Sequence, residues 1–141
     1  MSAQDQEAIM KELTLDETLT LGIEEIDGDH SKLIELYNIL NQSVTKGASR
    51  EYVEAVLEEM INCTIWHFSH EERLMLKYGY SGYEQHKQDH KDLIEGASKL
   101  KQKFLQASKL EEEDLVYLER WLTEHILVSD SRLADFLIEA M

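Results

Sequence analysis

Apolar residues recur every three or four positions along most of the chain, which is the spacing of one face of an α-helix. In the second periodic segment, one narrow sector of a helical wheel holds Val56, Met60, Cys63, His67 and Leu74. The chain has no proline, and its six glycines lie mostly between the periodic segments, which favours long helices over strands. The pattern predicts helices at about 27–46, 49–78, 83–107 and 111–128, and a short helix at 131–140.

Short connections between four such helices make sequential neighbours antiparallel. We therefore predict an all-α fold, an up-down-up-down antiparallel four-helix bundle with an N-terminal arm and a short C-terminal helix. Asp27 and Asp29 are the expected caps of the first helix. The chain is expected to form a single domain over 1–141, with the arm at 1–20, the bundle at 27–128 and the tail at 130–141.

Five of the six histidines, together with two carboxylates, occupy positions that such a bundle brings together. Glu71 follows His67 by four residues and His90 follows His86 by four, so each pair lies on one face of its helix. In this topology, the first and third helices start at the end where the second and fourth finish, and the candidates all fall there. The set is His30, His67, Glu71, His86, His90, His125 and Asp130.

Asp130 is the member that regular helix geometry does not place. It follows His125 by five residues, which is about 140° around a straight helix. The carboxylate can face the same site only if the helix ends or distorts between the two residues. Spacing alone therefore leaves a solvated Asp130 and a metal-binding Asp130 as equal alternatives.

These seven side chains predict a site for two metal ions, because one zinc ion takes only four ligands in a structural site. Neutral imidazoles suit iron, zinc, copper or nickel, and carboxylates can bridge two ions. Two six-coordinate ions need twelve donor positions, of which five imidazoles, two bridging carboxylates and one bridging oxygen supply eleven. The last position is open to a small ligand.

Two competing metal motifs are missing from the sequence. Ferritin-like di-iron bundles use Glu-x-x-His pairs, and no histidine here has a glutamate three residues before it. The zinc protease motif His-Glu-x-x-His fails because Leu74 stands at the position of its second histidine. We expect a structural or surface role for His70, and a buried inert thiol for Cys63.

The charge of the chain excludes several classes of partner. Lys and Arg number 14 against 29 Asp and Glu, a formal net charge of −15, so nucleic acid and anionic lipid surfaces are repelled. No apolar run reaches the ~20 residues of a membrane span, and no signal-peptide core opens the chain. With a single cysteine, which cannot form an internal disulfide, we expect a cytoplasmic protein without membrane insertion.

Four segments together resemble the hemerythrin family, in particular its single-domain bacterial members. They are 21–30 (LGIEEIDGDH), 67–72 (HFSHEE), His86 with His90, and 121–126 (WLTEHI) with Asp130. The resemblance implies a non-haem di-iron centre, bridged by Glu71, Asp130 and an oxo or hydroxo oxygen. One iron would be held by His86, His90 and His125, and the other by His30 and His67.

The same resemblance implies reversible O2 binding, for storage, transport or delivery, by a protein that is not an enzyme. O2 would bind at the open position on the two-histidine iron, in an apolar pocket that keeps water away. The expected lining is Leu33, Phe68, Trp121, Leu122 and Ile126. The alternatives are a redox sensor, a sensor of O2 or NO, and a di-iron peroxidase or NO-reducing enzyme, with Cys63 and His70 as candidate acids. NO and peroxide stay open as ligands, and a redox or oxidase protein as a partner.

Three positions depart from the usual family pattern, and none is a candidate ligand. Asp29 stands where a glutamine often precedes the first ligand, and Ser81 where a proline commonly follows the tyrosine. Leu15 stands where a tryptophan is frequent. These departures bear on how the N-terminal arm and the turn before residue 83 pack, and they leave the metal assignment intact.

Overall fold

The structure is a computed structural model that describes residues 19–141. Within that range every regular element is a helix. The elements are α2 (Glu24–Thr45), α3 (Arg50–Tyr78), α4 (Tyr83–Ala107), α5 (Glu112–His125), the π-helical turn η1 (Ile126–Asp130) and α6 (Ser131–Ala140). Most of the predicted arm at 1–20, including Leu15, lies outside the described residues. None of the helices from residue 19 onward is long and apolar enough to cross a membrane.

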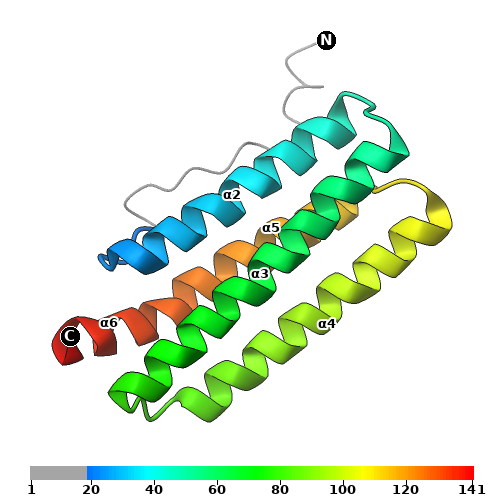
Figure 1. Ribbon diagram of the computed structural model, residues 1–141. Coiled ribbons are helices and arrows are strands. Elements are labelled where there is room, and N and C mark those ends of the chain that lie inside the picture. Colours follow the sequence, from blue (N-terminus) through cyan, green and yellow to red (C-terminus); the bar gives the residue numbers. More distant parts are fainter. Residues whose placement is uncertain (1–18) are drawn as a thin grey trace.

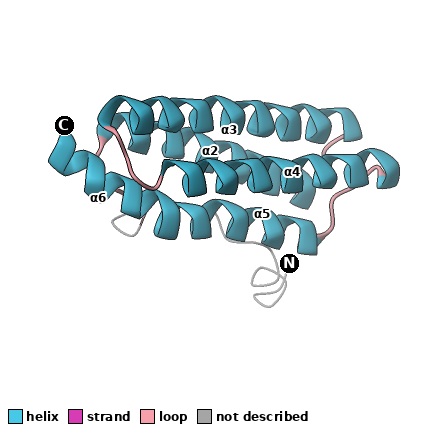
Figure 2. Ribbon diagram, turned by 90° about the horizontal axis from the view of Figure 1, so that it is seen from below, coloured by secondary structure: helices cyan, strands magenta, loops and turns pink. Residues whose placement is uncertain are grey.

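The long helices form an antiparallel four-helix bundle, so the predicted fold class is confirmed. Each of α2 and α4 packs against both α3 and α5, which closes the bundle (Figure 1). The α5 helix runs through η1 into α6, which extends past the bundle and contacts α3 (Figure 2).

Local signals explain most helix ends. The Ser49 side chain accepts a hydrogen bond from the Tyr52 amide, 3.2 Å away, and so caps α3. Gly79 ends α3 in the left-handed region at φ 70°, where glycine carries no steric penalty. At the start of α5, Glu111 and Asp114 form a reciprocal capping box.

The predicted start of the first helix was wrong. The helix begins at Glu24, with Ile23 at the N-cap, so Asp27 lies within its first turn and does not cap it. The Asp27 carboxylate instead accepts hydrogen bonds from the amides of Leu21 (2.8 Å) and Gly22 (3.1 Å), which secures the loop that precedes the helix. Asp29 is not a cap either, since its carboxylate faces the neighbouring helix α3.

The apolar core consists of two clusters. The larger one is built around Tyr37, Leu57 and Leu118, and the smaller one around Ile26 and Leu133. Along α2 and α3, the candidate ligands His30, His67 and Glu71 lie between residues of the two clusters, so packed apolar side chains flank them on both sides.

Candidate metal centre

The structure brings all seven candidate ligands together inside the bundle. Their donor atoms form two overlapping groups, and within each group they lie no more than 4.8 Å apart. The first group is Glu71, His86, His90, His125 and Asp130, and the second is His30, His67, Glu71 and Asp130. Glu71 and Asp130 belong to both groups, which is the arrangement that two bridging carboxylates require.

A local distortion of the helix places Asp130 in this cluster. In η1, the Ser131 amide donates to the Ile126 carbonyl five residues earlier, so the turn is wider than an α-helical turn. Asp130 is thereby turned inward and is 1 % exposed, with Oδ1 3.1 Å from His125 Nε2. The π-helical turn is therefore the distortion that the five-residue spacing between His125 and Asp130 requires.

The nitrogen and oxygen atoms that could bind metal lie close together, but not all of them form hydrogen bonds. His30 Nε2 lies 2.9 Å from Asp130 Oδ2, and His86 Nε2 lies 3.1 Å from Asp130 Oδ1. Several buried donor atoms nevertheless have no hydrogen-bond partner: His30 Nε2, His67 Nε2, His125 Nε2, Glu71 Oε2 and both Asp130 oxygens. Buried polar atoms without partners are costly, and a bound cation would satisfy them. Five imidazoles and two carboxylates around two points therefore fit a pair of transition-metal ions.

The carboxylates of the cluster favour protonation of the neighbouring histidines. Burial lowers the pKa of His67, but its hydrogen bond to Asp29 and the attraction of Glu71 outweigh burial and raise it to about 10. Burial also lowers the pKa of His86, but the carboxylates of Asp130 and Glu71 outweigh burial and raise it to about 9. Burial raises the pKa values of Glu71 and Asp130, yet contacts with the surrounding histidines hold both well below their usual range. Metal binding must displace these protons.

An apolar cavity adjoins the cluster beside His30, His67 and His125. Its volume is about 10 Å³, measured as room for the centre of a water-sized sphere. Trp121 turns its polar Nε1 away from the cavity, because it donates to the Leu93 carbonyl at 2.8 Å. All five residues expected for the O2 pocket line this cavity: Leu33, Phe68, Trp121, Leu122 and Ile126.

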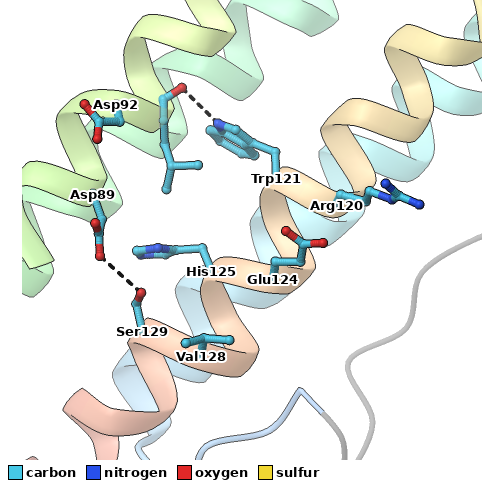
Figure 3. Close-up of a pocket in the computed structure, with 9 residues that line it drawn as sticks. Asp89, Asp92, Arg120, Trp121, Glu124, His125, Val128 and Ser129 are labelled. Atoms are coloured by element: carbon cyan, nitrogen blue, oxygen red, sulfur yellow. Dashed lines mark hydrogen bonds between the residues drawn. The ribbon is translucent and has the colours of Figure 1, made fainter.

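A second, wider pocket of about 380 Å³ opens on the surface between α4 and the α5–η1 junction (Figure 3). Its lining includes the charged residues Asp89, Asp92, Arg120 and Glu124, with His125 extending from α5 toward α4. The Ser129 hydroxyl donates to Asp89 Oδ2 at 3.3 Å and ties η1 to α4. Of the two groups of candidate ligands, the one that contains His125 therefore lies nearer to this open surface.

Comparison with known proteins agrees with this geometry. The family described as "Hemerythrin HHE cation binding domain" matches residues 21–137. The chain belongs to the hemerythrin family. The bacteriohemerythrin of Pseudomonas paraeruginosa is 30% identical over 132 residues, which are 94% of this chain and 86% of that protein. The bacteriohemerythrin of Stenotrophomonas maltophilia is 32% identical over 123 residues, 87% of this chain and 80% of that protein. A crystal structure of wild-type hemerythrin superposes with a TM-score of 0.80 at 24% identity, covering 92% of this chain and 98% of that one, and so supports the fold.

The hemerythrin resemblance drawn from the sequence is thus confirmed. Membership of a cation-binding family and a buried cluster of His, Glu and Asp side chains together indicate that the protein can hold metal at this cluster.

In this hemerythrin-family chain, the Nδ1 atoms of two candidate histidines contact carboxylates that the sequence did not lead us to expect. His67 Nδ1 lies 2.8 Å from Asp29 Oδ2, and His90 Nδ1 lies 2.9 Å from Glu72 Oε2. Such partners fix the ring so that Nε2 points to the metal. The position of Glu72 directly after the candidate ligand Glu71 could have indicated this role. For Asp29, the indication was its departure from the glutamine that is frequent in the family. His70 is not a lone surface residue, because both of its nitrogens meet carboxylates.

Proposed function

We propose that this chain holds two iron ions at the seven candidate ligands and binds O2 reversibly at the two-histidine ion. The proposal rests mainly on one observation: the apolar cavity is lined by both histidines of the two-histidine group, His30 and His67, and by one histidine, His125, of the other group. Two ferrous ions would supply the two electrons that O2 takes up on binding. Glu71 and Asp130, which lie in both donor groups, would hold the ions close enough to act on one O2 molecule.

The size and the chemistry of the cavity support O2 as its ligand. A cavity needs about 10–15 Å³ by the same measure to hold one water molecule, so about 10 Å³ suits a molecule of two or three atoms and no organic substrate. Leu33, Phe68, Leu122 and Ile126 offer no hydrogen bond to water, and Trp121 directs its N–H elsewhere. These side chains would protect bound O2 from hydration.

The lining favours a carrier over a di-iron enzyme. Reducing peroxide, NO or O2 consumes protons, so an enzyme needs an acid that faces the substrate. Among the described residues that line the cavity, the ionisable ones are candidate ligands and the others are apolar. Cys63 and His70, the acids considered from the sequence, do not line it. Storage, transport, delivery and sensing all begin with the same binding step.

The optical spectrum of the anaerobically reduced, iron-loaded protein on mixing with O2 tests the proposal. We expect a visible absorption band that appears with O2 and disappears when argon removes it, over several cycles. His90→Ala, which removes a candidate ligand, should lose both iron and the band. A protein that carries one zinc ion, or that oxidises on mixing without a reversible band, would refute the carrier function.

A further inference from the structure

A chain of alternating carboxylates and imidazoles runs from the candidate ligand His67 to the surface. His67 Nδ1 lies 2.8 Å from Asp29 Oδ2, and the same oxygen lies 2.6 Å from His70 Nδ1. His70 Nε2 in turn lies 3.2 Å from Glu25 Oε2. The side chain of His67 is 1 % exposed, those of Asp29 and His70 are each 12 %, and that of Glu25 is 44 %. The four residues thus connect a buried position to solvent.

We propose that Asp29 is a positioning residue for His67 and that His70 acts on the metal centre by holding Asp29. The inference rests on the proposed di-iron site, because it assigns His67 to the two-histidine ion. It gives His70 a role that is neither ligation nor simple surface exposure.

Metal binding through Nε2 would fix the tautomer of His67. A neutral imidazole that binds metal through Nε2 carries its one proton on Nδ1. That proton faces Asp29 Oδ2, so the carboxylate fixes both the tautomer and the plane of the ring. A negative carboxylate also makes the imidazole a stronger donor to the metal.

His70 holds Asp29 in place. Its carboxylate is close to the surface, where water competes for its lone pairs and its side chain could rotate outward. His70 prevents this rotation by donating from Nδ1 to the oxygen that His67 uses. On its far side, His70 Nε2 faces Glu25 Oε2 at 3.2 Å, and the Trp66 ring lies beside it at a centroid distance of 5.6 Å and an interplanar angle of 44°.

The geometry of the two helices brings these four side chains together. Glu25 and Asp29 are four residues apart on α2, while His67 and His70 are three apart on α3, so two residues of one face meet two of the other. Both nitrogens of His70 are directed at these carboxylates, and so it is not available to the ion that His67 binds.

The other half of the centre offers a matched comparison. Glu72 stands behind His90 as Asp29 stands behind His67, at 2.9 Å from Nδ1. Glu72→Gln should therefore weaken the three-histidine site without involving His70. The corresponding substitution, Asp29→Asn, should weaken the two-histidine site, and the size of its effect should depend on whether His70 is present.

The test is a double-mutant cycle on the full chain, with ferrous affinity measured anaerobically by chelator competition. Loss of a carboxylate behind a metal-binding histidine costs about 10- to 100-fold in affinity, which we expect for Asp29→Asn. His70→Ala should cause a smaller loss. Because His70 acts through Asp29, the double variant should be no weaker than Asp29→Asn alone. His70→Asn, whose amide can take the place of Nδ1 and still donate to Asp29, should restore most of the affinity and serves if His70→Ala does not fold.

Two further measurements separate positioning from loss of structure. In zinc-loaded protein with 15N-labelled histidine, the His67 Nδ1–H proton should exchange faster with water in His70→Ala than in the unaltered chain. The reduction potential of the iron-loaded protein should rise in Asp29→Asn, because the negative charge that favours the ferric state is gone. Fully additive losses in the cycle, or an unchanged exchange rate in His70→Ala, would overturn the inference. If these effects appear in a protein that does not bind O2, the proposed function fails and the positioning role stands.

Discussion

Leu122 should control how long the O2-bound protein survives. Its side chain is 4 % exposed and lines the cavity beside the candidate ligands. At about 10 Å³ the cavity is at the lower limit for a single water molecule, about 10–15 Å³. Leu122→Ala removes three carbons from this wall and takes the cavity past that limit. Water would then reach the bound O2 that we place in this cavity.

The magnitude follows from the size of the deleted group. Three buried carbons at ~0.8 kcal/mol each contribute about 2.4 kcal/mol, and Leu→Ala changes in cores cost about 2–5 kcal/mol in all. If about half of the transfer term acts as the barrier to water entry, conversion of the O2-bound form to the oxidised form should accelerate about tenfold. The melting temperature should fall by about 2–4 °C per kcal/mol at this chain length.

The assay follows the decay of the visible band of the O2-bound protein at equal iron content. Leu118→Ala is the matched control, since Leu118 is 1 % exposed, lies one turn earlier on α5 and does not line the cavity. It should destabilise the fold by a similar amount without changing the decay rate. Equal acceleration in both variants would mean that general loosening, and not the wall, governs decay. No acceleration in Leu122→Ala would refute the role of the wall altogether.

Three other outcomes are expected. Elemental analysis should find close to two irons per chain, and His90→Ala should lower both the iron content and the melting temperature, because metal binding is coupled to folding; unchanged metal would contradict the seven-ligand set. At saturating iron, His67→Ala should lose metal while His70→Ala keeps it, and equal losses would make His70 a ligand. The pKa values of His67 (about 10) and His86 (about 9) in the folded, metal-free protein exceed the usual 6.5, so their contribution to stability is complete below about pH 6.5 and is lost as pH rises through 9 to 10. Thermal melts from pH 6 to 10 should show this loss in the metal-free protein and not in the iron-loaded one, whose imidazoles are already neutral; parallel losses would assign the effect to other groups.

The helices and most of the candidate ligand set could be predicted from the sequence, because the features that define them are local. Apolar period, the Ser49 cap and the Gly79 stop act within a few residues, and the predicted bounds of 49–78 and 83–107 agree with α3 and α4 to within one residue. The pairing of His67 with Glu71 needs only the α-helical repeat. Convergence of the pairs at one end needs only the order and direction of the helices.

Tertiary structure decided what depends on contacts between helices. Asp130 follows His125 by five residues, and it faces the same side of the helix only because of the wide turn η1. Packing against α5 and α6 and the hydrogen bond from Ser129 to Asp89 hold η1 in place. Asp29 looked like a helix cap in the sequence, because the α3 side chains that it meets are about forty residues away in the chain. The sequence could name the five apolar residues of the cavity, but the room of about 10 Å³ between them is set by how closely the helices pack, and that room determines which molecule fits.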